Sequence, residues 1–234
     1  MIQNEKRFLE QLCDYSYFPK LLDSGTDGTE AFIEISRIKG IAGDDFFEDT
    51  RHRSVSELKA FILAILPILK TLQQQKIIHR DFIGQNLFVE TSGKKIINVG
   101  LIDFGWAIMT SENTTCVNPV GLGHIWIEDN NWSDFKTFAN YVRGIYGRMP
   151  YFRQIADELD KIDIADYDND EKVELVLSSV RKMLHTRPNG KTMYKFYRKK
   201  FSYLKAMSAK DIIASFMPKF IIRIYHKIKV ILHK

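Results

Sequence analysis

One stretch of the chain, residues 77–105, constrains its fold and chemistry more than any other feature. His79, Arg80 and Asp81 follow two isoleucines, and Asn86 comes five residues after Asp81. Asp103 lies seventeen residues beyond Asn86 and begins the triplet Asp-Phe-Gly. A carboxylate can orient a hydroxyl group, and Mg²⁺ prefers the hard oxygens of carboxylates and amides. The pattern therefore predicts a phosphoryl-transfer site in which Asp81 faces the hydroxyl and Asn86 and Asp103 bind the metal.

The segments around these residues favour the same interpretation. An apolar helix is predicted before His79, over residues 58–74, and two short strands with a Ser92-Gly93 turn follow Asn86. Any one of the three site residues alone is a common loop residue. All three at this spacing, each in such a setting, are more specific than any one of them.

This combination of motifs resembles the protein-kinase superfamily. The resemblance implies an α+β, protein-kinase-like fold with a mostly helical C-terminal lobe (C-lobe) and, here, a curtailed N-terminal lobe (N-lobe). It implies ATP and Mg²⁺ as cofactors and a hydroxyl-bearing acceptor. His79, Arg80 and Asp81 would form the catalytic loop, and Arg80 would bind a phosphate on the polar segment 106–131. A flexible surface loop is the alternative reading of that segment.

The beginning of the chain carries the N-lobe part of the resemblance. Phe8, Leu9 and Leu12 repeat at helical spacing, and Glu5 would be the glutamate that kinases pair with a lysine. A solvated glutamate in a first helical turn is an equal alternative. Two extended segments follow, and backbone groups of Ser36 and Ile38 would meet the adenine of ATP; a plain edge hairpin is the alternative.

Two elements that kinases carry ahead of this helix have no counterpart in the sequence. Only four residues precede Glu5, so neither a Gly-rich loop nor the lysine that pairs with Glu5 is present. Phosphate would lose its covering loop and a cationic contact. Three explanations stay open: a truncated product or fragment, an enzyme with a reduced N-lobe, or a chain without activity.

Two positions in the helical part lead to specific structural expectations. Pro67 lies inside the apolar helix pattern and predicts a kink or a break into two helices. Ser133 is a candidate N-cap for a helix that begins at Asp134. By resemblance Asp134 would tether that helix to the catalytic loop; a first-turn carboxylate near the helix dipole is the alternative.

The sequence divides into three predicted parts: a partial N-lobe over 1–39, a C-lobe over 40–207 and a basic amphipathic helix over 208–234. Residues 1–180 carry 19 Lys and Arg against 28 Asp and Glu, whereas 181–234 carry 15 against one. Such asymmetry bears on partners rather than on fold. Basic and aromatic residues interleave over 187–205, and we interpret them as a helix whose cations reach water rather than as a nucleic-acid site.

The last segment, residues 212–234, predicts either an anionic membrane surface as partner or a helix docked on the C-lobe. The N-terminus has no apolar signal region, and no run of eighteen apolar residues occurs. Two distant cysteines favour a reducing compartment. We therefore expect a cytoplasmic protein, with peripheral binding at the inner face of the membrane as a further expectation.

Position 83 bears on the acceptor. Many kinases of Ser or Thr in proteins carry a lysine two residues after the catalytic Asp, and Ile83 stands there. Together with the basic tail, this admits acceptors such as lipid-linked sugars, as in the lipopolysaccharide core kinases that protein kinases resemble, beside protein acceptors. The competing class is a pseudokinase-like binding module, which the missing Gly-rich loop and lysine favour.

Overall fold

The computed structural model describes residues 2–47, 55–93, 95–112, 133–146 and 149–186. These residues belong to one compact unit. The basic and aromatic segment 187–205, the predicted membrane-binding segment 212–234 and most of the polar segment 106–131 therefore lie outside the described residues. No helix within the described ranges is both long enough and apolar enough to cross a membrane.

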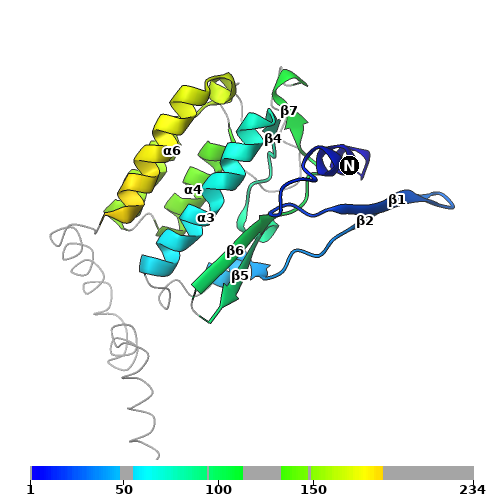
Figure 1. Cartoon of the computed structure of the whole chain (residues 1–234), viewed down its shortest axis with the longest axis horizontal. Helices are drawn as coiled ribbons and strands as arrows, with labels where there is room; N and C mark the ends of the chain where they lie inside the picture. The colour runs from blue at the N-terminus through cyan, green and yellow to red at the C-terminus, as the bar shows by residue number, and fades with distance from the viewer. Residues whose placement is uncertain (1, 48–54, 94, 113–132, 147–148, 187–234) are drawn as a thin grey trace, which may run out of the picture. The chain divides into compact units, whose positions relative to one another are not determined.

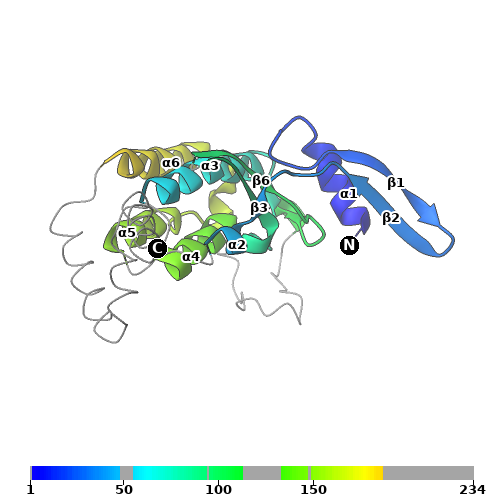
Figure 2. The same cartoon turned by 90° about the horizontal axis from the view of Figure 1, so that it is seen from below.

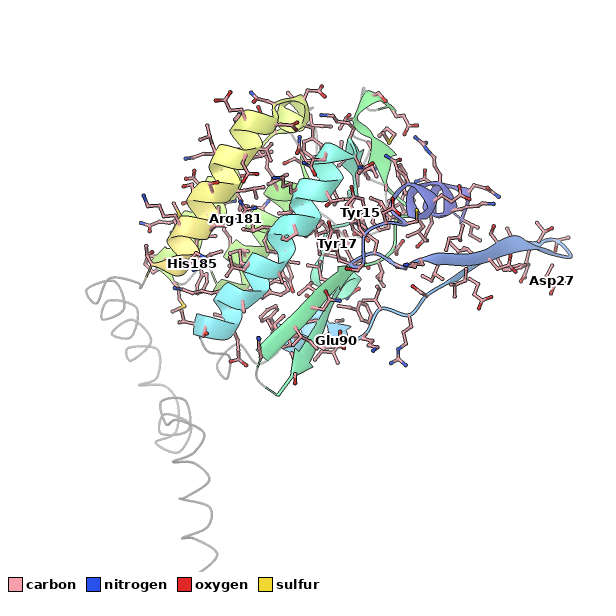
Figure 3. All side chains as sticks on the ribbon, in the orientation of Figure 1. Tyr15, Tyr17, Asp27, Glu90, Arg181 and His185 are labelled. Atoms are coloured by element: carbon pink, nitrogen blue, oxygen red, sulfur yellow. The ribbon has the colours of Figure 1, made fainter. Side chains whose placement is uncertain are left out.

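The N-terminal part consists of helix α1 (Ile2–Gln11) and a two-stranded antiparallel hairpin, β1 (Leu21–Asp27) and β2 (Glu30–Ile35). Phe8 and Leu9 of α1 are fully buried, as their helical spacing predicts. The hairpin lies next to α1 and extends away from the helical part of the molecule (Figures 1 and 2), with Asp27 at its far end (Figure 3). Most of its side chains are exposed.

Gly40 connects the hairpin to the C-lobe. Its φ angle is +121°, and a Cβ atom there would lie 2.5 Å from the carbonyl carbon and oxygen of Val89. Only glycine satisfies both conditions. The chain then forms β3 (Ile41–Ala42), which pairs with β5, and the short helix α2 (Gly43–Phe47).

Helix α3 (Val55–Gln74) is the central element of the C-lobe. Its apolar residues are buried on most sides, as the sequence predicts. The expectation that Pro67 breaks this helix in two is wrong, because α3 continues through it. Pro67 faces solvent, so water can satisfy the carbonyl group that loses its backbone donor, while buried neighbours on both sides hold the helix together.

Two small sheets present the polar motifs. Strand β5 (Leu87–Ser92) lies between β3 and β6 (Lys95–Leu101), and the β5–β6 turn contains Gly93 at φ +62°, as the Ser92-Gly93 signal predicts. Strand β4 (Ile77–Ile78) pairs with β7 (Ile108–Met109). Short 3-10 turns, η2 (Gly84–Asn86) and η3 (Thr110–Glu112), follow β4 and β7.

The remaining described helices are α4 (Asp134–Tyr146), α5 (Pro150–Leu159) and α6 (Asp170–His185), with the 3-10 turn η4 (Ile164–Asp168) before α6. Helix α6 packs along α3 (Figure 1), and α4 packs against α5 (Figure 2). Ser133 caps α4 as predicted, because its Oγ accepts from the Lys136 backbone N–H at 3.3 Å. The expected α+β class is confirmed.

Two tyrosines join the segment after α1 to α3 (Figure 3). Gln75 donates to the Tyr15 hydroxyl at 3.1 Å, and the Tyr17 hydroxyl bonds to Thr71. The Leu101 N–H also donates to the Tyr17 carbonyl at 2.9 Å. The N-terminal part is thus fixed to both α3 and β6, the elements that lead into the polar motifs.

Candidate active site

The predicted catalytic loop connects β4 to η2. Helix α3 precedes β4 in the chain. Asp81 and Asn86 are both 8% exposed. The Asn86 Nδ2 atom donates to the Asp81 Oδ2 atom at 2.7 Å and to the Asp81 carbonyl at 2.9 Å. These bonds use the amide nitrogen of Asn86 and leave its Oδ1 atom as the group that can bind a cation.

Asp103 follows strand β6 and is brought to the same place by the backbone. The Ile102 N–H donates to the Asn86 carbonyl at 3.0 Å, so Asp103, the next residue, lies near Asn86 although seventeen positions separate them in sequence. Asp103 has φ +67°, a left-handed conformation that is uncommon outside glycine. The Gly105 N–H donates to its Oδ1 atom at 3.3 Å. The structure therefore brings together Asp81, Asn86 and Asp103, as the sequence predicts.

The donor set suits Mg²⁺. An amide oxygen and a carboxylate are hard ligands, and Mg²⁺ commonly takes only one or two protein ligands beside phosphate oxygens and water. In the part of the chain that the structure describes, no group of three or more His, Cys, Asp or Glu side chains could hold a metal without such help. Asn86 and Asp103 would hold the ion together with its phosphate.

His79 and Phe104 form the apolar support under these residues. Both are fully buried, with ring centroids 4.7 Å apart in an edge-to-face arrangement, and Phe18 contacts Phe104 at 5.4 Å. The His79 Nε2 atom bonds to the Ile102 carbonyl at 3.0 Å. Burial lowers the pKa of His79, against the opposing charge of Asp81, so the ring is neutral at pH 7. It supports the loop rather than facing solvent.

Asp134 tethers helix α4 to the catalytic loop. It is fully buried, and its two carboxyl oxygens accept from the backbone N–H groups of His79 at 2.7 Å and Arg80 at 3.1 Å. Burial raises its pKa to about 7, while those two donors and the Arg80 charge act in the opposite direction. Of the two alternatives, the tether describes the geometry, because the carboxylate faces the loop and not its own helix end.

Arg80 has φ +67°, like Asp103, and is half-buried. Its Nε atom donates to the Trp106 carbonyl at 2.8 Å. The guanidinium therefore already contacts the start of segment 106–131, where the phosphate-binding role was expected. The part of that segment with its hydroxyl residues lies beyond the described residues, so that role stays a prediction.

Glu5 lies close to the Asp-Phe-Gly triplet. Burial and then the charge of Asp103 raise the pKa of its carboxyl, and a hydrogen bond with the Phe104 backbone opposes the shift. Among the described residues no lysine or arginine forms an ion pair with it. Glu5 is thus positioned at the site, but the cation that the kinase resemblance implies is not supplied by this part of the chain.

The predicted adenine contacts lie just beyond β2. The Ser36 N–H donates to the Lys20 carbonyl at 2.8 Å, and its Oγ accepts from the Lys20 N–H at 2.8 Å. The Ile38 side chain packs over Gly100, where a Cβ atom would lie 2.5 Å from Ile38 Cγ2. The N–H of Ser36 is therefore engaged within the hairpin, and adenine contacts by Ser36 and Ile38 stay a prediction.

Sequence reasoning missed two groups at the site. Asn4 donates to backbone carbonyls after Phe104, although nothing in its sequence setting distinguishes it from a solvated residue. Tyr141 donates to the Asp44 carboxylate at 3.2 Å beside Gly84 of the catalytic loop. Burial and the Asp44 charge raise the pKa of Tyr141, so it remains a donor. For the Tyr141–Asp44 pair, the only available sequence signal was the glycine at position 84 in the predicted catalytic loop.

Comparison with known proteins finds distant similarity to two serine/threonine kinases. The chain is 29% identical over 105 residues to serine/threonine-protein kinase B of Synechocystis sp. and 31% identical over 119 residues to serine/threonine-protein kinase C of the same organism. These matches cover 45% and 50% of this chain but only 18% and 21% of the two kinases. The chain thus spans about a fifth of the curated relatives it matches. No family model matches the sequence.

The fold and the site define a protein-kinase-like, α+β structure with a mostly helical C-lobe and a curtailed N-lobe. The similarity to the two serine/threonine kinases is distant and extends over about half of the chain. It supports a relation to the protein-kinase-like superfamily and phosphotransferase chemistry in general.

Proposed function

We propose that this chain catalyses transfer of the γ-phosphate of ATP to a hydroxyl group of an acceptor. The observation that carries the proposal is the connection of three chemical groups: Asn86 bonds to Asp81 through its side chain and to Ile102, next to Asp103, through its backbone. This arrangement supports the proposal, because phosphoryl transfer requires a base for the hydroxyl proton close to oxygens that can bind the metal.

Each residue has a defined role in the proposed reaction. Asp81 orients the acceptor hydroxyl and accepts its proton as the hydroxyl oxygen attacks the γ-phosphorus, and the bridging oxygen leaves with ADP. Asn86 and Asp103 hold Mg²⁺, which would neutralise charge on the phosphate oxygens when bound. His79, Arg80 and Asp134 act through the position of the loop, because they contact its backbone or its neighbours rather than open space.

The acceptor and its location form the finer part of the proposal. Ile83 and the basic residues 212–234 favour a lipid-linked sugar or a protein at an anionic membrane surface, reached from the cytoplasmic side. The names of the two Synechocystis kinases indicate protein acceptors for those proteins. Segment 187–205 is not assigned to nucleic acid.

One observation favours a second candidate, a pseudokinase-like binding module. Glu5 pairs with no cation among the described residues, whereas the kinase resemblance implies a lysine partner for it. Such a chain would bind nucleotide weakly or not at all and act through its surface. The two candidates differ in turnover, so ATP hydrolysis and transfer assays on the purified chain separate them.

Calorimetric titration of ATP, with and without Mg²⁺, tests the metal site directly. We expect binding that requires Mg²⁺ and is lost in Asp103→Ala, because Asn86 and Asp103 would hold the ion that accompanies the phosphate. Asp23→Ala, an exposed carboxylate on the hairpin, is the matched control and should bind as the wild type does. Binding that is indifferent to both Mg²⁺ and Asp103→Ala would exclude the assigned site.

A further inference from the structure

A tight turn, Phe104–Ala107, follows the metal ligand Asp103. The Ala107 N–H donates to the Phe104 carbonyl at 3.0 Å and closes the turn. Asp103 itself has φ +67°, a conformation that costs free energy and persists only where its surroundings hold it. The position of the Asp103 carboxylate therefore depends on how firmly the turn beside it is held.

Side chains from two distant elements bind the carbonyl groups of this turn. The Asn4 Nδ2 atom donates to Ala107 at 2.6 Å and Gly105 at 3.0 Å, and lies 3.4 Å from the Phe104 carbonyl. Arg80 donates to the fourth carbonyl, that of Trp106, at 2.8 Å. All four carbonyl groups are thus engaged, three of them by one amide on α1.

The chemistry of this position suits asparagine. Its amide nitrogen has two N–H donors, and all of the groups it faces are acceptors. An aspartate of the same shape would bring a carboxylate to three carbonyl oxygens. The helix that carries Asn4 is fixed by the buried Phe8 and Leu9, and by an ion pair between Arg7 and Glu112 at 2.7 Å. The side-chain amide of Asn4 is therefore held in place by a helix that is itself fixed to the rest of the fold.

We propose that Asn4 is a positioning residue, which holds the turn after Asp103 and so sets the affinity of the site for Mg²⁺ with ATP. The effect on Mg²⁺ rests on the proposed function, whereas the hold on the turn does not. Helix α1 would then control the metal ligand through Asn4, from a hundred residues away in sequence.

Amide hydrogen exchange of the ligand-free, full chain tests the hold on the turn. In Asn4→Ala we expect the Ala107 amide to exchange about tenfold faster, because net hydrogen bonds of about 1 kcal/mol stabilise the closed turn. In Asn4→Asp the Ala107 amide should exchange at least as fast as in Asn4→Ala. Gln11→Ala is the matched control. It removes a hydrogen bond that a side-chain amide of the same helix donates to the Gln75 carbonyl, away from the turn. Equal exchange in Asn4→Ala and wild type, or equal acceleration in Gln11→Ala, would overturn the proposal.

Calorimetry tests the effect on the metal. We expect Asn4→Ala to weaken binding of ATP with Mg²⁺ about tenfold, while binding of metal-free ATP changes less than twofold. An equal loss for both forms would show a general effect on nucleotide and contradict the metal role. If the wild-type chain binds no nucleotide, the proposed function and the effect on Mg²⁺ both fail, and hydrogen exchange still decides whether Asn4 holds the turn.

Discussion

The side-chain amide of Asn86 donates to the Asp81 carboxylate at 2.7 Å, within a loop where both residues are buried. The bond fixes the orientation of Asp81 and occupies the Asn86 amide nitrogen rather than its Oδ1 atom. One interaction therefore orients two groups, the proposed base and one proposed metal ligand.

Asp81→Asn should remove most of any phosphotransferase rate while the fold and ATP affinity remain. An amide of the same shape cannot accept the hydroxyl proton, and loss of a general base lowers the rate by about 10²–10⁴-fold. Steady-state kinetics and ATP calorimetry on the same sample separate the two effects. Asp23→Asn, at an exposed position of β1, serves as the control. A rate near that of the wild type in Asp81→Asn would place the base elsewhere.

Asp134 should make stability depend on pH. Burial raises the pKa of Asp134 from the ordinary 3.8 to about 7. The stabilisation that the protonated carboxyl adds to the free energy of unfolding is therefore full below pH 4 and is lost as pH rises towards 7. The shift corresponds to on the order of 4 kcal/mol. Asp134→Asn lacks this titration. The free energy of unfolding of the wild type, minus that of the variant, should therefore fall between pH 4.5 and pH 7.5.

Whether this difference in the free energy of unfolding falls or rises with pH tests the raised pKa of Asp134. Chemical denaturation at several pH values gives the difference directly, because the other titrating groups cancel. Asp157→Asn, whose carboxylate is on the surface beside Arg143, is the surface control. A difference that widens with pH would mean that the two N–H donors and Arg80 keep Asp134 ionised in the folded chain.

Gly84→Ala should destabilise the catalytic loop. A Cβ atom there would overlap the Asp44 carboxylate and the Tyr141 hydroxyl, and it would lie 2.7 Å from Asp44 Cγ. We expect a loss of about 1–3 kcal/mol in the free energy of unfolding. Gly144→Ala, where a Cβ atom meets nothing, is the control.

A double-mutant cycle identifies the cause. In the Asp44→Ala background the Gly84→Ala substitution should cost clearly less, because the main obstruction has gone. An undiminished cost in that background would assign the effect to the backbone of η2 instead of the Asp44 carboxylate.

The C-terminal segment should bind anionic membranes. Residues 219–234 carry five Lys or Arg and no acidic residue, with apolar residues between them. We expect the full chain to sediment with anionic vesicles, and less so at high salt, because salt screens exposed charges. Removal of residues 212–234 should abolish sedimentation. If the full chain ignores the vesicles and the shortened chain unfolds, the segment belongs to the C-lobe core.

Several elements could be predicted because their signals are local. Helices α1 and α3 follow from apolar spacing, and the β5–β6 turn follows from Ser92-Gly93. The chemical residues of the catalytic loop were identifiable because their order and spacing are specific. Of the two expectations at Pro67, a kink or a break, the break is wrong, because a local rule about proline does not include the burial of α3 on either side.

The sequence by itself determined the class of fold and the candidate base and metal ligands, since short-range periodicity and motif spacing encode them. Only the tertiary structure decided what holds these groups. Asp134 reaches His79 across 55 residues, and Asn4 reaches Ala107 across 103. Such hydrogen bonds depend on how separate elements pack, and one polar side chain among many carries no sign of its distant partner. The supports of the site therefore became visible only when the helices and strands were placed together.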